Sequence, residues 1–253
     1  YEILIGLVGS EMCIRDRATA ANFDEEKLGE FAGYAHSLGR KVYVALNTLI
    51  QENELDDLLK NLDICVRCGV DALIVQDLGV AHVVKNAYPE LELHASTQMD
   101  NRTPDKVKFL HGLGFSQVVL ARELSLAEIQ AVHAACDVPL EVFVHGALCV
   151  SYSGQCYVSQ HCFGRSANRG ECAQFCRLKF DMVDSDGRMI EQGRHLLSLK
   201  DMNRGADLER LLDAGVTSLK IEGRLKDVAY VKNVTAWYRS RLDEIFKRRP
   251  EYH

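Results

Sequence analysis

The sequence predicts an α/β fold, a TIM-like (β/α) barrel with a cysteine-rich insertion after a late strand. Helical patterns alternate with short apolar, β-branched runs from about residue 24 onward, and 253 residues is a usual size for one such barrel. Because parallel strands need a helix to return the chain between them, this alternation favours a parallel sheet covered by helices. One domain is therefore expected.

Seven runs have the composition of strands. They are 41–47, 72–77, 91–97, 117–123, 140–145, 196–201 and 217–222. The clearest helical patterns follow Asp24, a favourable N-cap, and span about 52–68, 79–88, 206–213 and 227–247. A closed barrel needs eight strands, one more than these runs supply.

Polar residues stand where the predicted strands end. They are Asn47, Gln76, Asp77, Thr97, Gln98, Arg122, Glu123, His145, Lys200, Asp201, Glu222 and Arg224. In parallel α/β folds the active site gathers at the carboxyl ends of the strands, so we expect these side chains to line a shared pocket. Ordinary loop polarity is the alternative explanation.

Composition narrows the classes of function. The chain has 30 Lys and Arg against 36 Asp and Glu, a net charge of -6, so any contact with RNA must be local. Nine cysteines, an odd number in a chain too large to need disulfides, favour a reducing compartment. The apolar run 3–8 is too short for a membrane span and lacks the basic start of a signal peptide. A soluble, cytoplasmic protein without membrane contact is expected.

Four cysteines form the most informative pattern, Cys149-x6-Cys156-x15-Cys172-x3-Cys176, where the helix–strand rhythm breaks. Four soft thiolates select zinc or an iron–sulfur cluster over hard cations. Zinc ribbons present two tight knuckles, and only the last pair has that spacing. The residues alone leave a cluster, zinc and free thiols open.

The residues around the first two of these cysteines match a known signature, E-x-F-x2-G-[SA]-[LIVM]-C-x4-G-x-C-x-[LIVM]-S, from Glu141 to Ser159 without a miss. By this match the chain resembles the U32 peptidase-like family. Within that family, four segments look most like the branch that makes 5-hydroxycytidine in 23S rRNA. They are 164–170, 195–201, 218–224 and 230–233.

The resemblance implies a (β/α)-barrel domain with a [4Fe–4S] cluster on Cys149, Cys156, Cys172 and Cys176. It also implies oxygen-independent hydroxylation of an RNA base, with prephenate as the hydroxyl source. Ribosomal RNA is then the expected partner, and an electron donor or assembly partner of unknown kind is a further expectation. Many such sequences carry the label "collagenase-like protease".

The resemblance runs from about Ala18 to the end, and it divides the chain. Residues 7–17 look like a translated sequencing adaptor, so residues 1–17 are predicted to be non-native and 18–253 to form the barrel domain, with the insertion at about 146–195. Family members begin with a further strand–helix–strand before the position of Ala18. The barrel is therefore expected to be incomplete at its N-terminus.

Site roles beyond the cysteines follow from position. His145, Asp201 and Glu222 are the predicted acid–base or substrate-orienting residues. The basic residues predicted to track RNA phosphates are Arg165, Arg169, Arg177, Lys200, Lys220 and Arg224.

Two other functions remain as alternatives. One is a true U32 peptidase, which His145 and Cys149 would serve as base and nucleophile, although neither H-E-x-x-H nor G-x-S-x-G occurs. The other is a zinc-stabilised RNA-binding module without enzymatic activity.

Overall fold

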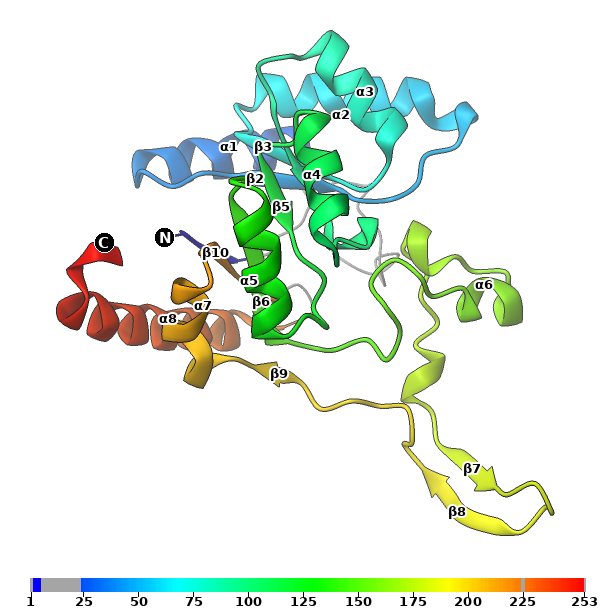
Figure 1. The fold of residues 1–253 in the computed structure, drawn as a ribbon. Coiled ribbons are helices and arrows are strands. Elements are labelled where there is room, and N and C mark those ends of the chain that lie inside the picture. The colour runs from blue at the N-terminus through cyan, green and yellow to red at the C-terminus, as the bar shows by residue number, and fades with distance from the viewer. Residues whose placement is uncertain (1, 6–23, 224–225, 253) are drawn as a thin grey trace.

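A curled, mostly parallel β-sheet forms the centre of the protein (Figure 1). The computed structural model describes residues 2–5, 24–223 and 226–252. The sheet strands are β1 (Glu2–Ile5), β2 (Tyr43–Leu46), β3 (Ala72–Val75), β4 (Glu92–Ala95), β5 (Gln117–Val119), β6 (Leu140–Gly146), β9 (Met202–Asn203) and β10 (Val216–Ile221). Their order is β1-β10-β6-β5-β4-β3-β2, and β9 pairs with β6 in the antiparallel sense.

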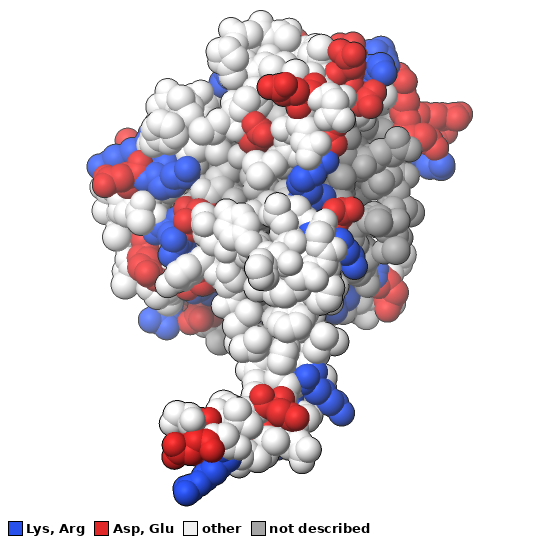
Figure 2. Space-filling view, turned by 90° about the vertical axis from the view of Figure 1, so that its right-hand side faces the viewer, with Lys and Arg blue, Asp and Glu red and all other residues white. Residues whose placement is uncertain are grey.

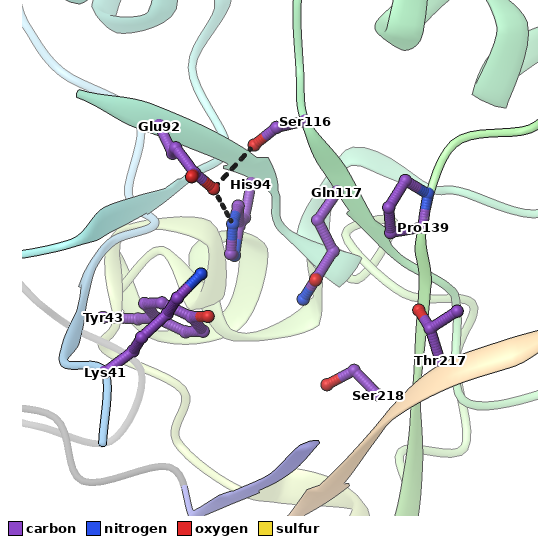
Figure 3. A pocket seen from close by; sticks show the side chains of 9 residues that line it. All are labelled: Lys41, Tyr43, Glu92, His94, Ser116, Gln117, Pro139, Thr217 and Ser218. Atoms are coloured by element: carbon purple, nitrogen blue, oxygen red, sulfur yellow. Dashed lines mark hydrogen bonds and ion pairs between the residues drawn. The ribbon is translucent and has the colours of Figure 1, made fainter. Parts of the chain in front are cut away.

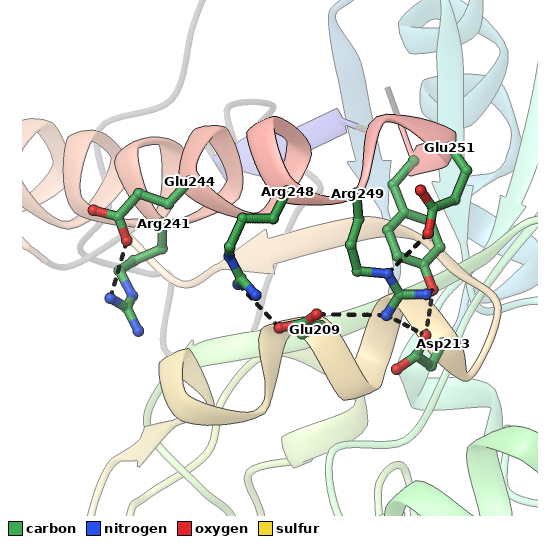
Figure 4. A network of polar contacts seen from close by, with 8 residues as sticks. Glu209, Asp213, Arg241, Glu244, Arg248, Arg249 and Glu251 are labelled. Atoms are coloured by element: carbon green, nitrogen blue, oxygen red, sulfur yellow. Dashed lines mark hydrogen bonds and ion pairs between the residues drawn. The ribbon is translucent and has the colours of Figure 1, made fainter.

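Helices connect most of these strands, and one more helix, α8, follows the last strand. They are α1 (Glu25–Ser37), α2 (Leu55–Arg67), α3 (Leu78–Ala87), α4 (Pro104–Gly112), α5 (Leu126–Ala135), α7 (Leu208–Asp213) and α8 (Val228–Arg248). Their starts follow the capping rules, since Asp24, Asp77 and Ser125 each accept a hydrogen bond from the first turn of the next helix. Ion pairs between Glu209 and Asp213 of α7 and arginines at the end of α8 join the last two helices (Figure 4).

Alternating strand residues separate the two faces of the sheet. Leu73 and Val75 of β3 pack in the main core with the helices, whereas Ile74 lies in a small second cluster with Ala45, Val119 and Phe143. Successive side chains of a strand point to opposite faces of a sheet, so this alternation shows that the two faces pack against different groups of residues. The sheet therefore has an outer, helix-covered face and an inner face.

The strand order is that of a barrel opened at one place. β1 pairs with the last strand, β10, as the first strand of a (β/α) barrel does, and the described residues show no pairing between β1 and β2. The predicted α/β fold is confirmed as a curled parallel half-barrel. Only residues 2–5 of the stretch predicted to be non-native are described, and they form β1; the remainder lies outside the described residues.

One predicted strand is wrong. Residues 196–201 form a turn and an extended connection, and Leu196, Leu197 and Leu199 are about two-fifths exposed. The physical reason is that β10 already pairs with β6 along its length, so no parallel position is left between them. The chain adds only the two-residue β9 at this place.

Between β6 and β9 the chain leaves the sheet. This 147–201 segment contains the short helix α6 (Val158–Phe163) and the antiparallel hairpin of β7 (Phe180–Val183) and β8 (Met189–Arg194), which projects from the body (Figure 1). None of the described helices combines the length and apolarity that crossing a bilayer demands.

A cavity of about 260 Å³ lies at the amino ends of the strands, opposite the predicted site (Figure 3). Tyr43, Glu92 and Gln117 begin strands that line it, and His94 lies beside them. The His94 side chain is 2% exposed, and its Nδ1 atom has no hydrogen-bond partner. Burial lowers the pKa of His94, against the opposing effect of Glu141 and Glu92.

We expect this neutral histidine to make stability fall in mild acid. Below the ordinary histidine pKa of 6.5, the unfolded chain takes up a proton that buried His94 does not. The free energy of unfolding should then drop by up to about 1.4 kcal/mol per pH unit. Urea unfolding of wild type and His94→Gln at several pH values checks this, because the wild type should have the steeper slope. Equal slopes would show that His94 does not contribute.

Candidate functional site

Arg122 is the centre of the polar contacts at the carboxyl ends of β5, β6 and β10. Its Nη1 atom lies 2.5 Å from Oε2 of Glu222 and also donates to the carbonyl oxygen of Ala147. Its guanidinium lies 3.7 Å from the ring centroid of Phe143. Both charged side chains are mostly buried, so the ion pair is screened less than a surface pair.

Gly146 makes room for this arrangement. Its φ is +128°, and a Cβ atom here would lie 2.5 Å from Cβ of Glu222. A side chain at this position would therefore push Glu222 away from Arg122. The sequence identified both Arg122 and Glu222 as strand-end residues, but nothing in it indicated that they pair.

His145 faces α8 and not the inner face of the sheet. A register shift between Lys220 and Ile221 places His145 opposite Ile221, whose side chain belongs to the outer core. The Nδ1 atom of His145 is 3.3 Å from the Tyr238 hydroxyl, which itself donates to Val144 O at 2.7 Å. Burial lowers the pKa of His145, and Asp201 opposes this shift.

Tyr230, in the first turn of α8, lies beside His145. Its ring centroid is 5.9 Å from that of His145. Burial raises the pKa of Tyr230, and the carboxylates of Asp201 and Glu222 raise it further. Tyr230 is therefore in ring contact with His145 and is influenced by the charges of Asp201 and Glu222.

The start of the 147–201 segment is docked on the same end of the sheet. Ser153 donates from its backbone nitrogen and its hydroxyl to the Glu123 carboxylate, each at 2.9 Å. Gly154, with φ of +78°, passes so close to Gln98 that a Cβ atom would lie 2.0 Å from its carbonyl oxygen. The signature glycine therefore permits a close backbone contact between the segment and the sheet.

Two hydrogen bonds join the neighbours of the four predicted ligand cysteines. Arg177, next to Cys176, donates to the carbonyl oxygen of Leu148, next to Cys149, at 2.6 Å. The backbone nitrogen of Ala173, next to Cys172, donates to the Ser159 hydroxyl at 2.9 Å, three residues beyond Cys156. The fold thus ties together chain regions that lie far apart in the sequence.

The thiol of Cys176 is influenced by the other three predicted ligand thiols. Burial raises the pKa of Cys176, Arg177 lowers it, and Cys149, Cys172 and Cys156 each raise it. All four are half-buried, whereas Cys162 is exposed. Among the described residues, no group of three or more His, Cys, Asp or Glu side chains is arranged so that it could hold a metal ion. Four thiols in one segment are nevertheless the type of donor that an iron–sulfur cluster or zinc selects.

The predicted RNA-binding residues are dispersed. Arg169 pairs with Glu54, and Lys220 pairs with Glu141 at 2.6 Å beneath the surface. Arg177 holds backbone groups of the segment, and Arg224 lies outside the described residues. Arg165 and Lys200 are exposed. The face with the projecting hairpin shows basic and acidic groups interspersed (Figure 2).

The protein is an α/β half-barrel: its curled parallel sheet has polar residues at the carboxyl ends of the strands, and a segment with four half-buried cysteines follows β6. The family model "Peptidase family U32" matches residues 2–252. The chain belongs to this family, as its signature residues predicted.

The chain is similar to two curated proteins and to one solved structure of this family. The chain is 51% identical over 222 residues to the 23S rRNA 5-hydroxycytidine C2501 synthase of Escherichia coli (strain K12), covering 88% of this chain and 34% of that protein. It is 34% identical over 233 residues to tRNA hydroxylation protein P1 of Bacillus subtilis (strain 168), covering 90% and 55%. The solved U32 peptidase Mk0906 shares the fold, with a TM-score of 0.52, 14% identity, and coverage of 87% and 83%. The chain spans about a third to a half of these two curated relatives.

Proposed function

We propose that this protein takes part in oxygen-independent hydroxylation of a base in RNA, with 5-hydroxycytidine in 23S rRNA as the product. The 51% identity to the Escherichia coli synthase supports this substrate, and a relative named for tRNA hydroxylation supports the wider class. The polar site at the carboxyl ends of the strands is where a (β/α)-barrel enzyme carries out its chemistry.

A [4Fe–4S] cluster on Cys149, Cys156, Cys172 and Cys176 is the proposed cofactor. The observation that supports it is that the thiols of Cys149, Cys156 and Cys172 influence Cys176, whose neighbour Arg177 donates to the backbone next to Cys149. When bound, such a cluster supplies one-electron redox chemistry, with a potential set by nearby charge and hydrogen bonds. Prephenate remains the proposed hydroxyl source.

His145 is the proposed proton acceptor of the site. The Tyr238 hydroxyl gives its hydrogen to Val144 O, so Nδ1 of His145 carries the proton in their contact and Nε2 keeps its lone pair. Because burial lowers the pKa of His145, the ring is neutral at pH 7 and can accept a proton at Nε2. Asp201 is near enough to stabilise the charged ring that results.

Contact with RNA is proposed to be local. Arg165, Lys200 and Lys226 are exposed and carry the positive charge that phosphate contacts need. An unpaired base extruded from the RNA would then reach the carboxyl ends of the strands.

The test is an anaerobic incubation with rRNA that lacks the modification, with and without prephenate, followed by mass spectrometry of the nucleosides. We expect cytidine to gain one oxygen atom with the wild type and with Cys162→Ala, and not with Cys172→Ala. An iron-loaded protein that leaves rRNA unmodified would contradict the proposed reaction. Cleavage of gelatin after removal of the metal would favour a peptidase, and RNA binding by a colourless zinc protein would favour a binding module.

A further inference from the structure

Two arginine side chains hold the backbone just before Cys149. Arg122, which follows β5, donates to the carbonyl oxygen of Ala147. Arg177, which follows Cys176, donates to the carbonyl oxygen of Leu148 at 2.6 Å. Two consecutive carbonyls are therefore held, one from the sheet and the other from the 147–201 segment.

Each guanidinium is itself held in place. Arg122 pairs with Glu222 at 2.5 Å and stacks on Phe143 at 3.7 Å. The Nη1 atom of Arg177 donates to the Ser198 hydroxyl at 2.8 Å and to the carbonyl oxygen of Leu199 at 3.1 Å. Neither arginine has to be ordered when a ligand arrives, because its contacts within the protein already fix its position.

We propose that Arg122 and Arg177 form an arginine clamp that positions Cys149 and controls how long the thiol site retains its cluster. This inference rests on the proposed cluster function. It assigns Arg122 and its partner Glu222 a positioning role and gives Arg177 a role other than RNA binding.

The chemistry of the contacts supports a role in retention. A ligand leaves a metal site when its backbone moves away, and Cys149 follows the two held carbonyls directly. Hydrogen bonds from a charged donor are roughly twice as strong as neutral ones. Lysine offers a compact ammonium without the planar fork of arginine, so it should restore only part of the effect.

The experiment compares Arg122→Gln, Arg177→Gln and Arg122→Lys with wild type. Arg249→Gln is the matched control, because Arg249 is also a partly buried, ion-paired arginine, but at the far end of α8 (Figures 1 and 4). Hydrogen exchange of the metal-free proteins is read in peptides covering 147–157. Iron release to a chelator is then measured on the loaded proteins.

Both glutamine variants should exchange faster in 147–157, with peptides from β3 to β5 unchanged. They should also lose iron about tenfold faster, as expected for the loss of one charge-assisted hydrogen bond. Arg122→Lys should fall between them and wild type, and Arg249→Gln should match wild type. Unchanged exchange would overturn the clamp, and faster exchange with normal iron retention would overturn its role in positioning.

The two proposals fail in distinguishable ways. A wild type that binds no iron would contradict the proposed cofactor, yet the exchange data on the metal-free proteins would still test the clamp. If the arginine variants retain iron as well as wild type, the clamp is refuted, but the proposed RNA hydroxylation is still tested separately by mass spectrometry of the modified nucleoside.

Discussion

Replacing Cys172 with alanine is expected to abolish cluster binding. A [4Fe–4S] cluster is usually held by four cysteine thiolates, and the chain offers four half-buried cysteines in this segment as its proposed ligands, so the loss of one should prevent stable binding. Wild type purified without oxygen should be brown and contain about four irons per chain, and the variant should contain less than about one. Visible absorption with iron, sulfide and zinc analysis provides the measurement.

The matched control is Cys162→Ala. Cys162 lies on α6 within the same segment, but its thiol is exposed and does not contribute to the pKa of Cys176. This variant should keep the colour and the iron of wild type. A colourless wild type holding one zinc, or equal iron in both variants, would refute the assignment of these ligands.

The local parts of the fold could be predicted from sequence because they depend on near neighbours. Capping by Asp24 and the apolar run 72–75 identify a helix and a strand without knowledge of the rest of the chain. The direction of parallel strands then places residues such as Arg122 and Glu222 at a common end. That step uses only the pattern and a general property of parallel sheets.

The pairing of side chains could not be predicted in the same way. Lys220 lies near the end of a predicted strand, so the sequence predicts a contact with RNA phosphates. Its actual partner is Glu141, which lies 79 residues away in the sequence. His145 was expected to line the pocket, and the register shift beside Ile221 turned it toward α8. Both outcomes depend on the alignment of β6 with β10, which no local pattern specifies.

The sequence spacing of the four cysteines allowed only part of the site to be predicted. Their separation excluded a pair of tight zinc knuckles but did not show that the four thiols would meet. The hydrogen bonds that join the chain next to these cysteines come from Arg177 and Ser159, neither of which is a proposed ligand. Such supporting residues belong to ordinary hydrogen-bonding types, and their role becomes visible only in the folded chain.

Lys220→Met is expected to destabilise the protein strongly. The Glu141 side chain is 0% exposed and the Lys220 side chain 11%, and their charged atoms are 2.6 Å apart. Removing the lysine leaves a buried carboxylate whose remaining donors among the described residues are Gln117 and Ser218, which should cost about 3 to 5 kcal/mol. Urea unfolding of the variant and of Lys220→Met/Glu141→Gln measures this loss.

The double variant should recover much of the stability, because it removes the uncompensated charge together with its partner. A non-zero coupling energy between the two positions would show that Lys220 stabilises the interior through Glu141. Lys220 would then no longer be counted among the proposed RNA-binding residues. If Lys220→Met instead unfolds like wild type and binds RNA more weakly, the ion pair is dispensable and the prediction of a phosphate contact stands.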